Sequence, residues 1–441
     1  MPYDIIVGRN EADKQRFGNE GLIYIGKQFV RMGELTSLSN RILMDVARSH
    51  VILIAGKRGS GKSYTLGVIA EEISTLPENI SSNISCLIFD TMGIFWTMKY
   101  PNEREIGLLR EWGMLPQRVP IKIFVPFGFF SEYEKRGLPV DNTFALKVSE
   151  LTGDDWCITF GLKFTEPVAV MIQRVISRLR EQLEDSGREY DLEDIIKEVK
   201  GDREMDVTTK QATISLFEGA KTWKIFARKN ERSIEISQLV EGGKTTIIDL
   251  SCYSSLSKFN IRALVIGLIS RKLFNERTLA RKSEEIQAVQ RGIDYLHYKQ
   301  KREMPLVWLF IDEAHEFLPK EGETAASDTL KQILREGRQP GISLILATQQ
   351  PGVIHRDVMT QADIVIAHRV TAKPDLEALN LIMQSYLFQD IKSYMNSLPD
   401  VKGSAIVLDD SSERIYPIRI RARFTWHGGE APTSVVVRNR I

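Results

Sequence analysis

A glycine-rich loop at residues 56–63 most constrains the fold of this chain, because its pattern needs a strand before it and a helix after it. The letters GKRGSGKS fit G-x-x-x-x-G-K-[ST] in full, with the apolar run VILIA before them and the helix-like stretch YTLGVIAEEI after them. Glycines let backbone N–H groups turn toward phosphate oxygens, and a helix N-terminus adds partial positive charge. A chance turn is the alternative. The expected phosphate-binding residues are Gly56, Gly59, Ser60, Gly61, Lys62, Ser63 and Tyr64.

A second segment, LVWLFIDEAH at residues 306–315, places an acidic pair at the end of an apolar run. Ligands gather at the carboxyl ends of strands in a doubly wound sheet. We expect Asp312 to complete a Mg²⁺ shell with Ser63, and Glu313 to polarise an attacking water. The alternative is an acidic pair that caps the next helix. For His315, a packing role and a catalytic role both remain open.

Two further segments carry weaker signals. Gln349 follows the apolar run ISLILAT and is a candidate sensor of the γ-phosphate, although a strand-end amide can equally satisfy a loop. Arg338 lies between two glycines just before that run. An arginine offered from an exposed loop can stabilise phosphoryl transfer in a neighbouring subunit, but many such arginines only bind carboxylates or carbonyls.

Short apolar runs separated by helical patterns predict an α/β fold with a mostly parallel sheet buried on both faces. The expected strands are 4–8, 22–30, 50–55, 86–90, 121–126, 245–250, 306–312, 342–348 and 363–368, with edge strands over 405–423. A helix is expected near 37–47, and an exposed helix or excursion over 276–303. Three helical stripes within 141–236 indicate a helical insertion.

Composition excludes several classes of protein. The chain has 441 residues and 59 Lys+Arg against 58 Asp+Glu, which excludes coating of nucleic acid by bulk positive charge but not a local basic pore. Its cysteines, Cys86, Cys157 and Cys252, form no CxxC pair, which favours a reducing compartment. No signal-peptide or membrane-spanning pattern is found. We expect a cytoplasmic protein without membrane contact.

The motifs together resemble the HerA–FtsK family of P-loop ATPases, and within it the HerA branch. The resemblance runs through GKRGSGKS, LIFDTMG, TTIIDLS, FIDEAHEFLP, REGRQPGISLILATQQP and IRIRARFTWHGG, from about residue 36 to 428. It implies a RecA-like core in two parts (36–140 and 237–428) around the insertion at 141–236, with a small β element at 1–35 and a tail at 429–441. Members are ATP- and Mg²⁺-dependent, usually hexameric translocases on duplex nucleic acid, and HerA-type proteins work with a nuclease partner.

The resemblance also implies roles for single residues. It supports Lys62 and Ser63 at the phosphates, Asp312 for Mg²⁺ and Glu313 as the catalytic carboxylate. It implies that Gln349 is the sensor, that Arg338 is the arginine finger, and that Arg48 senses phosphate. A tail segment would reach a neighbouring subunit, the alternative being exposed residues of an edge strand; its members here are Arg419, Arg421, Arg423 and His427.

Some features depart from the family pattern. Only residues 1–35 precede the matching core, so the N-terminal barrel that docks a nuclease is expected to be reduced. The turn Asp90–Gly93 and the loop residues Lys57 and Arg58 also differ from the usual pattern. Pore contacts to a phosphate backbone are expected from 251–262 or 352–360, unless these are ordinary solvated loops; the candidates are Lys258, Arg262, His355 and Arg356.

Two functions follow as hypotheses. One is an ATP-hydrolysing homo-hexameric translocase or helicase on duplex nucleic acid, DNA in the first instance and duplex RNA as an alternative. The other is a nucleotide-switched hexameric platform that recruits an effector or nuclease. The complete set of hydrolysis residues favours the motor, because a passive binder would not need it.

Overall fold

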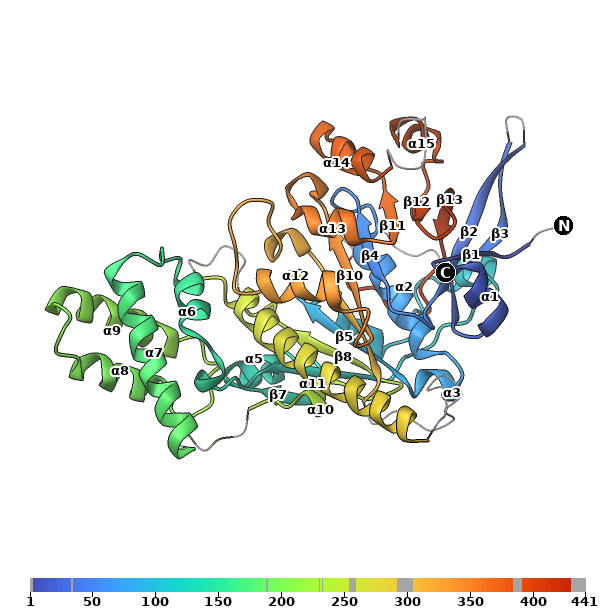
Figure 1. The fold of residues 1–441 in the computed structure, drawn as a ribbon. Helices are drawn as coiled ribbons and strands as arrows, with labels where there is room; N and C mark the ends of the chain where they lie inside the picture. Colours follow the sequence, from blue (N-terminus) through green and yellow to red (C-terminus); the bar gives the residue numbers. More distant parts are fainter. Residues whose placement is uncertain are drawn as a thin grey trace.

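The computed structural model describes residues 3–32, 35–187, 189–229, 231, 233–253, 259–291, 304–383 and 391–429. Its described strands form one sheet of thirteen in the order β1-β3-β2-β13-β12-β11-β4-β10-β9-β5-β8-β6-β7 (Figure 1). Their bounds are β1 Ile5–Val7, β2 Leu22–Met32, β3 Leu35–Asp45, β4 Val51–Ala55, β5 Ile84–Asp90, β6 Ile121–Pro126, β7 Asn142–Phe144, β8 Thr245–Asp249, β9 Leu306–Ile311, β10 Ile342–Thr348, β11 Ile364–His368, β12 Ser404–Asp409 and β13 Arg414–Ile420.

The strands from β11 to β7 are parallel to one another, and the seven central runs expected from the sequence are confirmed as strands. Their continuous apolar sequence follows from burial on both faces. In β4, Leu53 and Ala55 pack into one hydrophobic cluster, whereas Ile52 and Ile54 pack into the other. The carboxyl ends of β4, β10, β9 and β5 therefore meet at one edge, where the expected site residues follow the strands.

The N-terminal strands extend this sheet. β2 pairs with β3 and with β13 in antiparallel fashion, and β1 pairs with β3 in parallel. The expected helix near 37–47 is wrong, because that segment is the strand β3. Its buried Ile42 and Met44 alternate with exposed Arg41 and half-buried Leu43, a period of two that suits a strand pairing with β2.

The strands near the C-terminus are also placed differently from the expectation. β12 and β13 form over 404–420, as the alternation of residues predicts, but they are not edge strands. β12 pairs with β11 and β13, and β13 pairs with β12 and β2. The hairpin of β2 and β3 pairs with β13 through β2, on the side where the sequence predicts a free sheet edge. This explains why arginines on this segment are not simply exposed.

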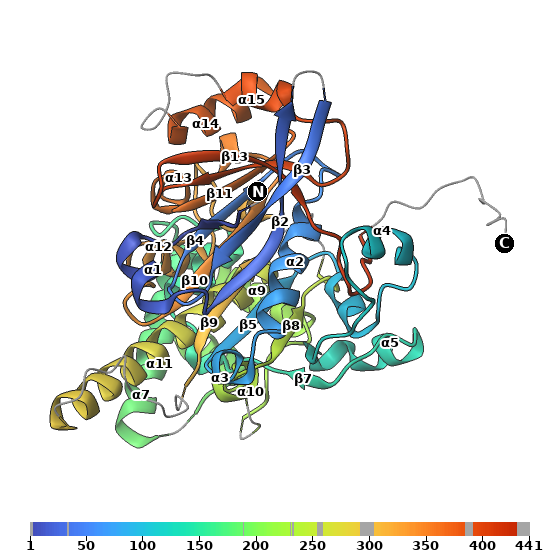
Figure 2. The ribbon, with the colours of Figure 1, turned by 90° about the vertical axis from the view of Figure 1, so that its right-hand side faces the viewer.

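Helices cover both faces of the sheet, and α6–α9 form a lobe that projects away from it (Figure 1). Turned by 90°, α2 lies in front of the central strands (Figure 2). The bounds are α1 Glu11–Phe17, α2 Lys62–Ser74, α3 Glu78–Ser81, α4 Ile106–Glu111, α5 Phe130–Lys135, α6 Gly153–Phe160, α7 Pro167–Ser186, α8 Leu192–Gly201, α9 Val207–Lys221, α10 Ile236–Leu239, α11 Ile261–Arg291, α12 Ser327–Glu336, α13 Arg356–Gln361, α14 Lys373–Met383 and α15 Ile391–Ser397.

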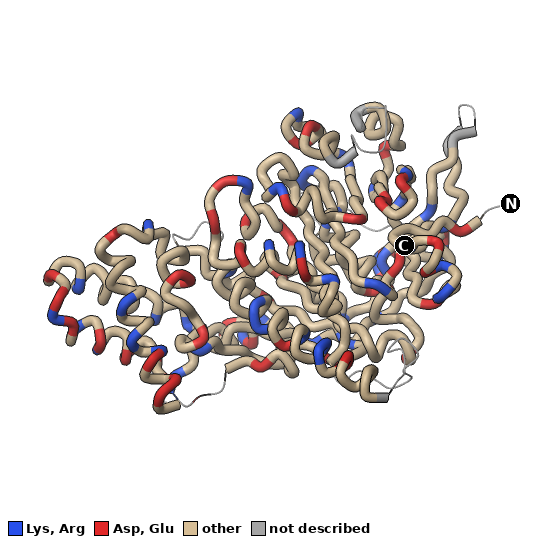
Figure 3. Tube along the Cα trace, viewed as in Figure 1, with Lys and Arg blue, Asp and Glu red and all other residues tan. Residues whose placement is uncertain are grey.

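The three helical stripes expected within 141–236 are confirmed as α7, α8 and α9, which pack on one another, and α7 also packs on α6. The charged stretch from 276 continues α11 as far as Arg291, and residues 292–303 lie outside the described part of the chain. Lys and Arg are interspersed with Asp and Glu along the trace (Figure 3). Among the described helices, none is both long and apolar enough to cross a membrane.

Candidate functional site

The phosphate loop connects the end of β4 to the start of α2, as its sequence context predicts. Gly59 and Gly61 have φ angles of 75° and 110°, which L side chains rarely adopt. A Cβ on Gly56 would lie 2.4 Å from Ser60 Oγ. No side chain caps α2 at Gly61, so the first backbone N–H groups of this helix are left for a ligand. The loop therefore has the backbone of an anion-binding site.

Lys62 and Ser63 bring the loop to the acidic pair after β9. Ser63 Oγ donates a hydrogen bond of 2.5 Å to Asp312 Oδ2, across the position of β10. The Lys62 ammonium lies 3.3 Å from the carbonyl oxygen of Lys57. Burial lowers the pKa of Lys62, and the charges of Glu313 and Asp312 raise it. Lys62, Ser63 and the acidic pair thus share one site, as the sequence predicts.

Glu313 has an unusual backbone and one carboxylate oxygen without a hydrogen bond among the described residues. Its φ of 51° is left-handed, a strained conformation for a residue with a side chain. Burial first, and the charge of Asp312 second, raise the pKa of Glu313 to about 7. Within the described chain its Oε2 is buried and accepts no hydrogen bond. A buried carboxylate costs free energy unless it gains a partner, so this oxygen is suited to a water or to a bound group.

The donor set fits Mg²⁺. Asp312 Oδ2 and Ser63 Oγ are hard oxygen ligands within one hydrogen bond of each other, and Asp312 Oδ1 accepts from the backbone of Glu313 at 2.9 Å. Burial raises the pKa of Asp312, although hydrogen bonds from Ser63 and from the Glu313 amide and the charge of Lys62 lower it. A divalent ion would supply the missing positive charge. The buried Glu313 Oε2, which accepts no hydrogen bond from the described residues, supports the same fit.

The end of β10 contributes Thr348 and Gln349. The backbone amide of Gln349 lowers the pKa of Glu313, which places this half-buried residue beside the acidic pair. Thr348 Oγ1 lies 3.2 Å from His315 Nδ1, and the Gly56 amide donates to the Thr348 carbonyl at 3.2 Å. His315 Nδ1 lies 3.6 Å from Glu313 Oε2, and burial lowers its pKa. His315 therefore contacts a residue at the end of β10, Thr348, and a residue that follows β9, Glu313.

Sequence analysis missed His368, the fully buried last residue of β11. Its Nδ1 lies 3.2 Å from the Ser404 carbonyl, so this nitrogen carries the proton, and Nε2 accepts from Thr65 Oγ1 at 2.9 Å. Burial lowers the pKa of His368 to about 4, so the ring is neutral. It supports the first turn of α2 and packs against Gly56. A histidine at the end of a strand next to the loop strand was the available signal.

The tail arginines are placed differently from both expectations. Arg421 and Arg423 are buried, and both form ion pairs with Glu71 of α2, at 3.1 and 2.9 Å. A buried carboxylate needs such partners, which is why these arginines stay within their own chain. The His427 ring meets the Tyr64 ring edge-on at 5.1 Å. Arg419 lies over the Trp112 ring, 5.8 Å from its centroid.

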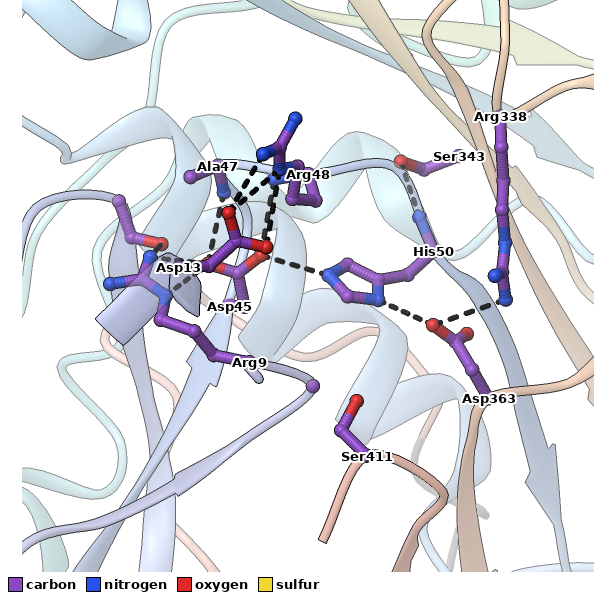
Figure 4. A network of polar contacts seen from close by, with 12 residues as sticks. Arg9, Asp13, Asp45, Ala47, Arg48, His50, Arg338, Ser343, Asp363 and Ser411 are labelled. Carbon is purple, nitrogen blue, oxygen red and sulfur yellow. Dashed lines mark hydrogen bonds and ion pairs between the residues drawn. The ribbon is translucent and has the colours of Figure 1, made fainter. Parts of the chain in front are cut away.

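Arg338 and Arg48 lie at the other edge of the sheet (Figure 4). Arg338 precedes β10, whereas Gln349 follows it, and seven strand residues span roughly 20 Å at about 3.3 Å each. Arg338 is 54% exposed and lies 3.3 Å from Asp363, and Arg48 lies 2.7 Å from Asp13. Neither arginine joins the phosphate loop of its own chain.

The remaining candidates are not gathered in one place. Arg262, expected at a pore, is buried against Glu316 at 3.6 Å, because α11 packs on the core from its first turn. Arg356 is exposed at the start of α13, and the His355 side chain caps that helix. Lys57 and Arg58 are exposed. Lys258 and residues 430–441 lie outside the described chain.

The turn after β5 is organised by its own aspartate. The Asp90 carboxylate accepts hydrogen bonds from the backbone amides of Met92, Gly93 and Phe95, at 3.2, 2.7 and 2.8 Å. Burial and the charge of Asp249 raise the pKa of Asp90 to about 8. The departure from the family pattern at this turn therefore has a local structural role.

Comparisons with known proteins agree with this geometry. A probable DNA double-strand break repair helicase HerA of Methanocaldococcus jannaschii is 27% identical over 209 residues, 44% of this chain and 40% of that protein. A DNA double-strand break repair helicase HerA of Saccharolobus solfataricus is 23% identical over 393 residues, 88% of this chain and 67% of that protein. The chain thus spans less than half of the first relative and about two thirds of the second.

The fold has a counterpart of known structure. VirB4 of Thermoanaerobacter pseudethanolicus superimposes with a TM-score of 0.54 at 13% identity, covering 91% of this chain and 97% of that one. This likeness confirms the predicted α/β P-loop fold. A family profile for the central domain of helicase HerA matches residues 30–273, more than half of the chain. With that match, a complete phosphate loop facing an acidic pair, and relatives along most of its length, the chain belongs to the HerA helicase family.

Proposed function

We propose that this protein is a Mg²⁺-dependent ATPase that works as a ring-forming, hexameric motor of the HerA kind on duplex nucleic acid, with DNA as the first candidate. The observation that carries the proposal is the contact of Ser63 with Asp312 beside Glu313 Oε2, a buried carboxylate oxygen that accepts no hydrogen bond from the described residues. A phosphate-binding site alone would hold a nucleotide. A carboxylate free to accept a proton from water is the part that hydrolysis needs.

Within this site the residues divide the work. The loop glycines, Ser60 and the start of α2 would hold the phosphates by backbone N–H groups, with Tyr64 in the following turn. Ser63 and Asp312 would hold Mg²⁺, which neutralises charge on the β- and γ-phosphates. Lys62 would contact the γ-phosphate, Glu313 would orient and deprotonate the water, and Gln349 would report the loss of the γ-phosphate through its neighbour Glu313.

The position of Arg338 supports a homo-oligomer. Its guanidinium projects from the opposite edge of the sheet and is 54% exposed, so it can reach phosphates only in a neighbouring copy. A ring of identical subunits, with six as the family's usual number, would pair each phosphate loop with an Arg338 from the next subunit. An arginine supplied in this way contributes about 10³- to 10⁵-fold to the rate.

Mixed rings test this arrangement. Lys62→Ala subunits keep Arg338 but have a defective nucleotide site, and Arg338→Ala subunits have the reverse defect. Each alone is expected to be inactive. The two variants are co-expressed with different affinity tags, and mixed rings are purified through both tags in turn. Hydrolysis is then expected to return at the nucleotide site of each Arg338→Ala subunit whose neighbour is a Lys62→Ala subunit with an intact Arg338. A mixture as inactive as its parents would contradict the role of Arg338 in trans.

The polymer is tested by ATP hydrolysis of the wild-type protein with duplex DNA, duplex RNA, single strands or no nucleic acid, with mass photometry on the same samples. The relatives named as DNA double-strand break repair helicases make duplex DNA the first candidate. Stimulation several-fold by one duplex would support the motor and identify its polymer. An unchanged rate with every polymer would favour a nucleotide-switched platform that recruits a nuclease or another effector.

All three cysteines are free thiols, in keeping with work in the cytoplasm.

A further inference from the structure

A buried imidazole joins two carboxylates that come from distant parts of the chain. His50, 3% exposed, lies just before β4. Its Nδ1 is 2.7 Å from Asp363 Oδ2, and its Nε2 is 3.0 Å from Asp45 Oδ2 (Figure 4). A neutral imidazole has a single N–H, so one of these contacts would then place two lone pairs face to face. Both contacts are hydrogen bonds only if the ring is protonated.

The charges around the ring support the same state. Burial by itself lowers the pKa of His50, but hydrogen bonds to Asp363 and Asp45 raise it to about 9. Asp45 comes from the end of β3 and also accepts from Arg9 Nε at 2.7 Å. On the other side Arg338 faces Asp363, and the charges of both act on Asp410. The Trp308 ring packs 6.2 Å from His50.

Asp363 links this imidazolium to Arg338. One of its oxygens accepts from the Val51 amide at 2.8 Å, which fixes the start of β4. The other oxygen lies between His50 Nδ1 and the Arg338 guanidinium, at 2.7 and 3.3 Å. The Asp363 side chain is only 12% exposed, so its charge is poorly solvated. If a positive charge on His50 did not balance part of the negative charge of Asp363, Asp363 would hold Arg338 more strongly.

Asp45 links the same imidazolium to the N-terminal strands and to Arg48. Its Oδ2 accepts from the Arg48 amide at 3.1 Å, and its Oδ1 from the Ala47 amide at 3.4 Å. Arg9 is in turn held by the carbonyls of Gly18 and Glu20, at 2.8 and 2.7 Å. The loop that carries Arg48 and the loop that carries Arg338 therefore meet at His50.

We propose that His50 is a positioning residue that connects the N-terminal β element to Arg338 and lets this arginine leave Asp363 for the nucleotide of the neighbouring subunit. The inference rests on the proposed action of Arg338 in trans. As Arg338 moves to the γ-phosphate, Asp363 keeps a positive partner in His50, so the move does not strand a half-buried carboxylate. His50 acts through Arg338 and touches no substrate.

The mixed rings distinguish this role from a structural one. The reference is the active mixture of Lys62→Ala with Arg338→Ala subunits. His50→Gln is then added either to the Lys62→Ala subunit, which donates Arg338, or to the Arg338→Ala subunit, which carries the working site. We expect the first placement to lower kcat by about 10- to 100-fold, as a misplaced catalytic group does, and the second to stay at the reference level.

The placements control for each other, because any loss of folding from His50→Gln affects both. A second control adds Arg335→Gln to the donor subunit; Arg335 is 60% exposed, pairs with Asp357 at 2.6 Å, and should leave the rate unchanged. Equal losses in both placements, or no loss in either, would overturn the proposal for His50. An inactive reference mixture would instead reject the role of Arg338 in trans, and with it the basis of this inference.

Discussion

Two buried histidines, at opposite edges of the same sheet, have opposite charge states. His50 precedes β4 at the amino edge, and carboxylates at 2.7 and 3.0 Å raise its pKa to about 9. His368 ends β11 at the carboxyl edge, where its partners are a carbonyl and a hydroxyl, and burial lowers its pKa to about 4. Equal burial therefore gives a cation in one place and a neutral ring in the other. The partners decide which.

The same contrast holds for the carboxylates. At the amino edge, Asp45 and Asp363 are fully paired within the chain by His50, Arg9 and Arg338. At the carboxyl edge, the pKa values of Asp312 and Glu313 are raised, and Glu313 Oε2 accepts no hydrogen bond in the described chain. One edge is complete by itself, and the other is complete only with a ligand. The two edges should therefore respond differently to substitution.

The largest expected effect is on the carboxyl edge. Glu313→Gln keeps the shape of the side chain but removes the base, so ATP hydrolysis should fall by about 10²- to 10⁴-fold. The thermal unfolding temperature should stay unchanged or rise, because the substitution removes a negative charge whose buried Oε2 accepts no hydrogen bond in the described chain. Glu321→Gln, at an exposed position nearby, is the control and should change neither quantity. A clear loss of stability in Glu313→Gln would mean that this carboxylate is paired in the folded protein.

A smaller effect, on stability rather than chemistry, is expected at the amino edge. The folded pKa of His50 lies above its ordinary value of 6.5, so its stabilisation is complete below pH 6.5 and is lost as the pH rises through about 9. The shift corresponds to about 3 kcal/mol. In urea unfolding, His50→Gln should therefore be less stable than the wild type at pH 6.5, and the difference should shrink toward pH 10. A difference that does not depend on pH would indicate packing instead of charge.

Much of the fold and of the carboxyl edge was predictable from local sequence. Each central strand is an apolar run that ends in polar residues, and the loop pattern needs its flanking strand and helix, so Lys62, Ser63, Asp312 and Glu313 could be assigned to one site. The strand over 37–47 could not be predicted from local sequence, because its alternation of buried and exposed residues becomes decisive only once β2 pairs with it. The burial of Arg421 and Arg423 was not predicted for a similar reason: their partner Glu71 is about 350 residues away in the chain.

Short sequence patterns predict the family, the parallel core and the phosphate-binding edge, because the residues of each pattern are neighbours in the chain. Tertiary structure alone decided which charges are paired. His50 meets Asp45 and Asp363 only after the N-terminal strands join the sheet beside β13, and Glu71 meets its arginines only after the C-terminal segment crosses α2. Burial raises the cost of every unpaired charge, so the long-range contacts that form on folding, rather than residue type, set the charge of each buried group.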